Sequence, residues 1–290
     1  MAINTGNRFL VTVDVGNTNI TIGLFLTDFL VNIENIGTDI PVNKQQALIK
    51  AVLTKNKVGK SNVQGVVISS VVPELNSRLK NIFVHLLDKQ PVFVNAAKSG
   101  IKTKYKNINK LGTDRIINIL SGRKLIDKAP VPLIVVDFGT TTTFDCADRY
   151  GTYLGGLIIP GMQSWLNSLN RYTSKLPLLS INDTGNSKPG LIGTDTESCI
   201  YSGLYNGYGS LVDGVLFQLQ KELSKGINNP GQAKCHKSCC SRKTDCLDNV
   251  RILFTGGLAQ KIINKITVPV QYIPDLILYG LKIYWENRRR

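Results

Sequence analysis

Histidine, long apolar runs and acidic residues are all scarce in this sequence of 290 residues. Only two histidines occur, His85 and His236, so chemistry that depends on a histidine acid or base has little to work with. His85 lies in the apolar stretch NIFVHLLDK, where we expect it to pack. No apolar run reaches the roughly 20 residues of a membrane-spanning helix, and Asp14 interrupts the one candidate signal peptide. We therefore expect a cytoplasmic protein with no membrane partner.

The shortage of acidic residues leaves a large positive charge. Thirty-five Lys and Arg face 20 acidic residues, a formal net charge of +15. Such a surplus can attract nucleic acid or phosphorylated small molecules, but apart from NRRR at the carboxyl end the basic residues are scattered. The sequence has no helix-turn-helix signal and no basic stripe interleaved with aromatic residues. We interpret the charge as solvated surface and expect no nucleic-acid partner.

The cysteines fall into two groups. Cys146 and Cys199 lie in apolar surroundings, where cysteine usually packs as a small hydrophobic residue. The other four form a cluster with His236, namely Cys235, Cys239, Cys240 and Cys246. This cluster lies in a polar stretch, residues 226–249, that is typical of an inserted surface loop. Its spacings match no common zinc motif, so a metal site, a redox response and no function all remain open.

Several familiar nucleotide and hydrolase motifs are also missing. The stretch TKNKVGKS ends like a phosphate-binding loop, but Thr54 stands where that motif needs glycine. There is no G-x-S-x-G elbow and no dinucleotide fingerprint.

What the sequence does contain is an alternation of strand and helix patterns. We predict strands at residues 9–13, 19–25, 65–70 and 91–94, and helices at 44–56, 71–88 and from Gly112 onward. A further long helix is predicted to begin near Thr194, with Thr194 and Glu197 as its capping box. This alternation favours an α/β fold.

The opening pattern occurs twice. The stretch FLVTVDVGNTNITI is followed 123 residues later by PLIVVDFGTTTTFD, so that Asp137, Gly139 and Thr141 stand where Asp14, Gly16 and Thr18 stood. We predict two related domains that face each other, residues 1–129 and 130–290.

The residues of this repeated turn suit phosphate. Glycine and small hydroxyl residues let backbone N–H groups come close to a phosphate, whereas Asp14 would repel it unless a divalent cation such as Mg²⁺ lies between them. Two such turns, with the glycines of FTGG as a surface for a base, predict a nucleotide held in an interdomain cleft. The alternative is an ordinary hairpin in which Asp14 bonds its own turn.

Asp114 is the candidate for chemistry. A carboxylate at a helix N-terminus beside Arg115 can accept a proton from a substrate hydroxyl, while the arginine binds an acidic group. A simple charge pair at the helix start remains the alternative. Gly203 and Gly207, four residues apart on the late helix, fit either internal packing or an oligomer contact.

Taken together, these segments resemble type III pantothenate kinases, members of the acetate and sugar kinase, Hsc70 and actin superfamily. The motifs that carry the resemblance cover nearly the whole chain except residues 226–249: DVGNTNITIG, ISSVVP, LGTDR, DFGTTTTFD, GGLIIPG, SKLP, GTDTESCIYSG and TGGLA. The resemblance implies two ribonuclease H-like (actin-like) domains and transfer of the γ-phosphoryl group of ATP to the primary hydroxyl of pantothenate, the first step of coenzyme A biosynthesis.

The resemblance also assigns residues, cofactors and partners. ATP phosphates and Mg²⁺ would be held by Asp14, Val15, Gly16, Asn17, Thr18, Asn19, Ile20 and Thr21, with Thr140 as a further ATP contact. Pantothenate would be held by Tyr105, Gly112, Thr113, Asp114, Arg115 and Thr196, with Asp114 as the proton acceptor. Asp137 would bind the monovalent cation, K⁺ or NH₄⁺. The family is dimeric, with the pantothenate pocket near the subunit interface.

Three features depart from the family pattern: Thr141 replaces the usual alanine, Ile108 replaces the usual proline, and residues 226–249 are an insertion. Two alternative functions are another phosphotransferase of the superfamily and an accessory transcription factor that shares the scaffold. The residues Tyr105 and Thr196, together with GTDR, favour pantothenate, because they concern the acceptor and not ATP.

Overall fold

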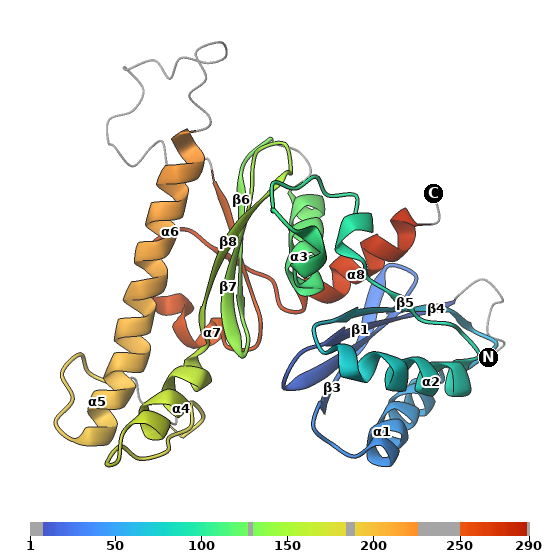
Figure 1. Ribbon diagram of the computed structural model, residues 1–290, viewed down its shortest axis with the longest axis horizontal. Helices are drawn as coiled ribbons and strands as arrows, with labels where there is room; N and C mark the ends of the chain where they lie inside the picture. Colours follow the sequence, from blue (N-terminus) through green and yellow to red (C-terminus); the bar gives the residue numbers. More distant parts are fainter. Residues whose placement is uncertain (1–7, 127–129, 184–188, 226–249, 289–290) are drawn as a thin grey trace, which may run out of the picture. The chain divides into compact units, whose positions relative to one another are not determined.

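The chain folds into two compact units, each an α/β structure as the sequence predicts (Figure 1). The computed structural model describes residues 8–126, 130–183, 189–225 and 250–288. Unit 1 contains the chain up to Ile101, Tyr105–Leu125 and the chain from Asp275 onward, and unit 2 contains Lys102–Lys104 and Ile126–Pro274. The boundary expected at Ala129 lies outside the described residues.

Each unit combines one sheet with several helices. The elements of unit 1 are β1 (Phe9–Val15), β2 (Asn19–Leu26), β3 (Phe29–Gly37), α1 (Val42–Lys55), β4 (Val63–Ser70), η1 (Pro73–Leu75), α2 (Asn76–Leu87), β5 (Val92–Phe93), η2 (Ala96–Lys98), η3 (Ile108–Lys110), α3 (Thr113–Leu125) and α8 (Leu276–Asn287). Those of unit 2 are β6 (Leu133–Phe138), β7 (Thr141–Ala147), β8 (Tyr153–Pro160), α4 (Met162–Tyr172), α5 (Thr196–Ser202), the π-helical η4 (Gly203–Gly207), α6 (Tyr208–Lys225), β9 (Arg251–Thr255), α7 (Ala259–Ile262), η5 (Ile263–Lys265) and β10 (Gln271–Tyr272).

The two sheets have the same topology. Their strand orders are β3-β2-β1-β4-β5 and, read from the equivalent edge, β8-β7-β6-β9-β10. In both, the first three strands of the unit form an antiparallel meander and the last two join it in parallel. The repeat seen in the sequence is therefore a repeat of the whole sheet.

The repeated turns differ in length by one residue. Asp14 pairs with Thr21 across the first hairpin, whereas Asp137 pairs with Thr143 across the second. The constant offset of 123 residues therefore ends at the turn, and Thr140, not Thr141, is the structural counterpart of Thr18. The predicted match of Thr141 with Thr18 was wrong, because sequence alignment cannot detect a one-residue shortening among four consecutive threonines.

The first sheet is covered on both faces. Alternating residues of the central strand, Val11, Val13 and Val15, pack with the buried sides of α1 and α2. The intervening face, which includes Thr12, meets α8: a Cβ atom at Gly23 would lie 2.6 Å from the Thr12 hydroxyl and 2.8 Å from Leu278. Figure 1 shows α1 and α2 on one side of this sheet and α3 and α8 on the other.

The last helix, α8, belongs to unit 1, although the sequence analysis assigned residues 130–290 to one domain. Glycines in unit 1 make room for it. A Cβ atom at Gly65 would lie 2.1 Å from the Trp285 ring, and one at Gly280 would lie 2.5 Å from the backbone oxygen of Ile117 in α3. Edge-to-face packing of Phe25 on Tyr279, with ring centroids 5.4 Å apart, adds an aromatic contact.

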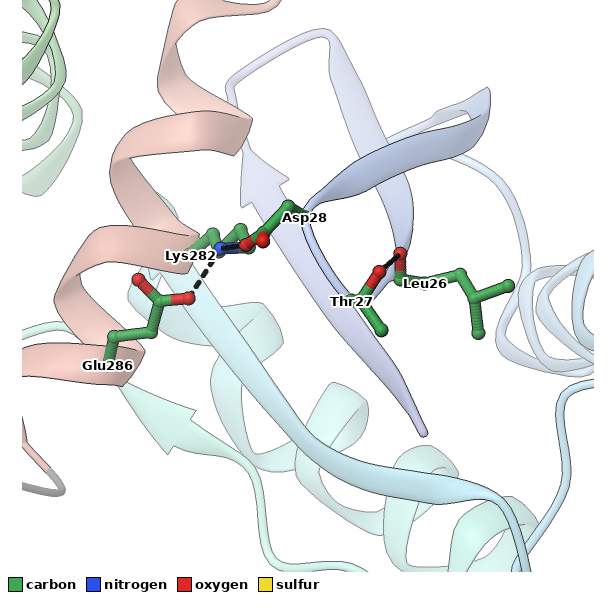
Figure 2. A network of polar contacts seen from close by, with 5 residues as sticks. All are labelled: Leu26, Thr27, Asp28, Lys282 and Glu286. Atoms are coloured by element: carbon green, nitrogen blue, oxygen red, sulfur yellow. Dashed lines mark hydrogen bonds and ion pairs between the residues drawn. The ribbon is translucent and has the colours of Figure 1, made fainter. Parts of the chain in front are cut away.

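A polar contact ties the same helix to the β2–β3 turn (Figure 2). The Lys282 ammonium donates to Asp28 at 2.7 Å and also to Glu286, one helical turn along. Partial burial alone would lower the pKa of Lys282, but its hydrogen bonds to the two carboxylates outweigh burial and raise it. The bond from Lys282 lowers the pKa of the exposed Asp28. The turn itself places Thr27 at a positive φ of 55°.

The second sheet packs its helices through one apolar face. Ile134, Val136 and Phe138 alternate along β6 and contact buried residues of α4, α6 and α7, among them Met162 and Val212. Figure 1 shows these three helices on the same side of the sheet. Within the residues that the structure describes, no helix has both the length and the apolar character needed to cross a membrane.

We predict that Gly280→Ala destabilises the protein through the α3–α8 contact. Alanine favours a helix over glycine by roughly 0.8–1 kcal/mol, but its methyl group would meet the backbone of α3, and such overpacking costs about 1–3 kcal/mol. Urea unfolding should show a net loss of stability. Gly214→Ala in α6 is the matched control, because its added Cβ meets nothing within 4 Å and should stabilise. Equal effects of the two changes would contradict the packing of α8.

Candidate functional site

The first predicted site is the turn between β1 and β2. Asp14 is half-buried at the end of β1, and the Gly16 N–H donates to the Asn19 carbonyl at 2.9 Å. The chain after β3 fixes this turn, because the Thr38 hydroxyl donates to the Gly16 carbonyl at 3.0 Å and its N–H to the Thr18 carbonyl at 3.0 Å. The neighbours Val15 and Ile20 are fully buried, while Asn17, Thr18 and Asn19 are exposed. Hydrogen bonds thus fix the backbone of this turn, and its polar residues are exposed.

The GTDR motif begins α3 in the same unit and is joined to the end of β4. The Thr113 hydroxyl lies 2.9 Å from the Ser69 hydroxyl and accepts the Ser70 N–H at 3.2 Å. Ser69 is in turn the parallel register partner of Asp14 in β1. Unit 1 therefore brings two sequence-predicted motifs, the phosphate turn and the start of α3, to the carboxyl ends of neighbouring strands.

Asp114 stands in the first turn of α3, where the helix dipole favours a carboxylate. Its Oδ1 accepts the Arg115 N–H at 2.8 Å. The preceding Gly112 leaves room for this carboxylate, because a Cβ atom there would lie only 2.4 Å from Asp114 Oδ1. Arg115 itself is 7% exposed, so its guanidinium is largely removed from solvent.

The other two residues predicted to contact the acceptor lie in different units. Tyr105 is half-buried in unit 1, in the loop between η2 and η3. Thr196 is the exposed first residue of α5 in unit 2. The helix start there differs from the prediction. The capping box consists of Asp195 and Ser198, not Thr194 and Glu197, and the Asp195 carboxylate accepts the Ser198 N–H at 2.9 Å. Its hydrogen bonds from the backbone and side chain of Ser198 lower the pKa of Asp195.

The second acidic turn, in unit 2, lies beside two threonines and a glycine. Asp137 ends β6 half-buried, with Thr143 and Thr255 as its register partners on the two sides. Gly256 follows with φ +87°, and a Cβ atom there would lie 2.5 Å from Asp137 Oδ1. Only glycine fits this position without strain. Glycine at position 256 thus lets the chain pass close to the Asp137 carboxylate and the Phe138 backbone.

Thr140 is exposed, and its backbone is fixed by the start of α4. Its carbonyl accepts the Gly161 N–H at 3.1 Å and the Ser164 hydroxyl at 2.7 Å. A Cβ atom at Gly161 would lie 2.3 Å from the Gly139 carbonyl. Below the turn, the Tyr208 hydroxyl donates to Thr142 at 2.7 Å, and burial raises the pKa of this tyrosine.

Sequence reasoning assigned no role to Ser69, Ser164 or Tyr208. The motif ISSVVP contains Ser69 and marks a strand end, but nothing in it indicates a bond to Thr113 that spans 44 positions of the chain. Ser164 and Tyr208 lie on helices that ordinary periodicity predicts. Only the fold shows that they reach the Thr140 turn.

Two expectations for single residues were wrong. His85 is exposed and, with Arg78, lines an open groove of about 600 Å³ between α1 and α2, which includes no predicted site residue. Cys146 is buried as expected, but Cys199 is exposed because it follows the first turn of the short helix α5. The cluster of Cys235, Cys239, Cys240, Cys246 and His236 lies outside the described residues. Among the residues that are described, no three Cys, His, Asp or Glu side chains gather as a metal site.

Comparison with known proteins gives one consistent family. The model of a family described as type III pantothenate kinase matches residues 10–218. The chain is 31% identical over 283 residues to the type III pantothenate kinase of Geotalea uraniireducens, covering 97% of this chain and 99% of the relative. It is 30% identical over 285 residues to that of Exiguobacterium sp., covering 97% and 100%.

Solved structures with the same fold are more distant in sequence. MreB5 of Spiroplasma citri, solved with AMPPNP, superposes with a TM-score of 0.52 at 13% identity, covering 97% of each chain. A candidate N-acetylmannosamine kinase from Listeria monocytogenes gives a TM-score of 0.51 at 11% identity, covering 98% of this chain and 100% of the other. This likeness concerns the fold alone and confirms the predicted two-domain, actin-like architecture.

We predict that the Thr113 hydroxyl stabilises the junction of β4 and α3. Thr113→Val keeps the shape of the side chain but leaves the fully buried Ser69 hydroxyl without this partner, a loss of about 1–3 kcal/mol. Thr113→Ser keeps the hydroxyl and should lose much less. Urea unfolding of both variants tests this, and a Thr113→Val variant as stable as the wild type would contradict the role of the hydroxyl.

Proposed function

The chain belongs to the type III pantothenate kinase family, and on this premise we propose which of its residues carry each part of the reaction. It is an ATP-dependent kinase that transfers the γ-phosphoryl group to the primary hydroxyl of pantothenate. The product is 4'-phosphopantothenate, and the reaction is the first step of coenzyme A biosynthesis. The family assignment, with relatives of that name over nearly the full length, decides for this activity over the two alternatives.

The observation that carries the assignment of residues is the path from Asp14 to Asp114 within unit 1. Asp14 is the register neighbour of Ser69, whose hydroxyl lies 2.9 Å from that of Thr113, and Thr113 directly precedes Asp114. This path supports the proposal that the phosphate turn and the acceptor motif work at one edge of the first sheet, because parallel strands end side by side.

We assign the ATP phosphates to residues 14–21 and Mg²⁺ to Asp14. The donor set fits, because one carboxylate and hydroxyl-bearing residues supply the oxygen ligands that Mg²⁺ prefers, and Mg²⁺ is commonly held by one or two carboxylates together with substrate phosphates. When bound, Mg²⁺ neutralises charge on the transferred phosphoryl group. The rigid turn then fixes the phosphate position, since its backbone is already bonded to Thr38.

We assign the acceptor to the start of α3. Asp114 accepts the proton from the primary hydroxyl of pantothenate as the phosphoryl group arrives. The bond from the Arg115 N–H to Asp114 Oδ1 keeps this carboxylate at the helix start. Arg115 pairs with the substrate carboxylate, because a guanidinium can bind a carboxylate through two parallel hydrogen bonds. Tyr105 and Thr196 complete the set of substrate contacts.

We assign the monovalent cation, K⁺ or NH₄⁺, to Asp137 and a further ATP contact to Thr140. Asp137 is half-buried near the end of β6, between Thr143 and Thr255 of the neighbouring strands, so its carboxylate stands at the same strand end as the Thr140 turn. Oxygen donors suit hard cations of this kind. Holding the reactants in this way is the main task of a phosphoryl-transfer enzyme, and orientation can supply roughly 7–11 kcal/mol of barrier lowering.

We also propose a homodimer formed through the π-helical segment η4 of unit 2, which begins at Gly203 and ends at Gly207. Gly203 and Gly207 are exposed, and a Cβ atom at either would meet nothing within 4 Å, so neither serves packing within the described chain. Beside them, Leu191 and Ile192 are 78% and 85% exposed, and the Ser202 hydroxyl donates to the Leu191 carbonyl. Small residues beside exposed apolar side chains suit close approach of a second copy.

We propose a cytoplasmic location, since ATP and the later steps of coenzyme A synthesis are found there. Fractionation of the source cells tests this, and recovery with the membranes would contradict it.

We predict that the purified protein makes phosphopantothenate from ATP, Mg²⁺ and pantothenate, and that K⁺ supports turnover whereas Na⁺ alone does not. Asp114→Asn keeps the size of the side chain but cannot accept the proton, so turnover should fall by about 100-fold or more. Product formation is followed by chromatography. Asp137→Asn serves as the comparison, because it should lose the K⁺ dependence and not the proton transfer.

The outcomes separate the two assignments. Full activity in Asp114→Asn would contradict its role as proton acceptor. Equal activity in K⁺ and Na⁺ would contradict a monovalent cation site at Asp137. A folded protein with no turnover under any cation would contradict the kinase activity itself.

We predict a species of twice the 31.9 kDa chain mass in analytical ultracentrifugation. Gly207→Leu should shift it toward the monomer, because the bulky side chain would stand on the proposed contact. Gly59→Leu is the control, since its Cβ position is also open but lies in unit 1. A wild-type monomer at all concentrations would contradict the dimer.

A further inference from the structure

A three-residue segment that precedes Tyr105 is bound to a single tyrosine. The Tyr153 N–H donates to the Lys102 carbonyl at 2.8 Å, and its carbonyl accepts the Lys104 N–H at 2.9 Å and the Thr103 hydroxyl at 3.3 Å. Thr103 and Tyr153 form a parallel β-bridge. Because of this pairing, Lys102–Lys104 group with unit 2, although the chain on both sides belongs to unit 1. Tyr105 is the first residue after the segment.

The side chain of the same tyrosine is fixed from within the unit. Tyr153 is 0% exposed, and its hydroxyl donates to Asp145 Oδ1 at 2.8 Å. Asp145 is likewise 0% exposed, and its other oxygen accepts the Thr143 hydroxyl at 3.2 Å. Burial of a carboxylate is costly unless hydrogen bonds compensate it, and bonds to an ionised acceptor are among the stronger ones in proteins. Asp145 therefore holds the Tyr153 ring in one place.

An irregularity in the sheet places Tyr153 for this task. The register between β7 and β8 shifts so that Ala147 pairs with Tyr153 while Cys146 pairs with Gly155, which has φ +116°. One extra residue, Leu154, is thus accommodated in β8. A β-bulge of this kind changes the direction of neighbouring side chains and often does so beside functional sites.

We propose that Asp145 and Tyr153 are positioning residues for pantothenate binding. Asp145 fixes Tyr153, whose backbone holds Lys102–Lys104, and this segment sets the place of the following residue, Tyr105. The inference rests on the proposed role of Tyr105 as a substrate contact. Neither Asp145 nor Tyr153 needs to touch the substrate, because the effect passes through the three backbone and hydroxyl bonds of the segment.

The test uses Tyr153→Phe, which removes the hydroxyl that reaches Asp145 and keeps the ring. We expect KM for pantothenate to rise about tenfold, which corresponds to about 1.4 kcal/mol, while KM for ATP stays unchanged. A loss of correctly folded enzyme would lower the apparent kcat and leave both KM values unchanged. A rise of KM for pantothenate without a rise of KM for ATP therefore identifies positioning. Asp145→Asn should also raise KM for pantothenate. The Asp145 carboxylate accepts one hydroxyl with each oxygen, whereas the nitrogen of the Asn amide cannot accept a hydrogen bond.

The matched control is Tyr205→Phe. Tyr205 is also buried in unit 2, at 8% exposure, and its hydroxyl donates to the Ile181 carbonyl at 3.3 Å, away from the Lys102–Lys104 segment. It should leave KM for pantothenate as in the wild type. Should Tyr153→Phe fail to fold, Thr103→Val removes only the partly buried Thr103 hydroxyl from the bridge and should raise the same KM by a smaller factor.

Hydrogen exchange of the full-length protein supplies a readout that is independent of activity. The amides of Lys104 and Tyr153 should exchange faster in Tyr153→Phe than in Tyr205→Phe, because the bridge opens more often. Unchanged exchange, or an equal rise of KM for ATP and pantothenate, would overturn the positioning role. A different result would show that Tyr105 does not contact pantothenate. In that case Tyr105→Phe would leave KM for pantothenate unchanged, whatever the exchange rates of the Lys104 and Tyr153 amides.

Discussion

The turns that follow β1 and β6 depend on a close approach of backbone and carboxylate groups that glycine permits, and both candidate sites are built on these turns. Each strand ends in a half-buried carboxylate, Asp14 or Asp137, followed by a glycine turn. In unit 2 the constraint is strict. A Cβ atom at Gly161 would lie 2.3 Å from the Gly139 carbonyl, and one at Gly256 would lie 2.5 Å from Asp137. Larger residues at these positions would push the backbone and the carboxylate apart, so glycine fixes the geometry of the turn.

Hydroxyl groups help to hold these strand ends in place. In unit 1 the Ser69–Thr113 contact joins β4 to α3, and in unit 2 the Tyr208–Thr142 contact joins α6 to β7. Neutral hydrogen bonds of this kind fix geometry without adding charge that would compete with a phosphate or a cation.

The sequence predicted local features well where a residue type allowed only one structure. The glycine and the carboxylate of DVGNTN marked the first turn, and the repeat predicted two related domains, whose sheets have the same topology. It failed where the outcome depends on residues that are distant in the chain. Nothing near Trp285 indicates that Gly65 makes room for it, so α8 could not be assigned to unit 1. The capping box was placed one residue early because Thr194 and Asp195 are both good cap residues, and only the fold decides between them.

The residues of the candidate site likewise divide into those that a local pattern indicates and those that only the fold reveals. Asp14, Asp114 and Asp137 were singled out from sequence because a carboxylate near glycine or at a helix start is a conspicuous pattern. Ser69 was not singled out, since a serine at a strand end has many roles and its bond to Thr113 spans 44 positions. Likewise, no local pattern indicates that Tyr153 binds Lys102–Lys104, because the bridge depends on a bulge in β8.

The most direct measurement is a crystal structure of the enzyme with pantothenate, Mg²⁺, K⁺ and an ATP analogue that cannot be hydrolysed. The account predicts that the primary hydroxyl of pantothenate lies within hydrogen-bond distance of the Asp114 carboxylate and that the analogue's phosphates contact residues 14–21. A complex in which that hydroxyl is bound by other residues, with Asp114 turned away from it, would contradict the account.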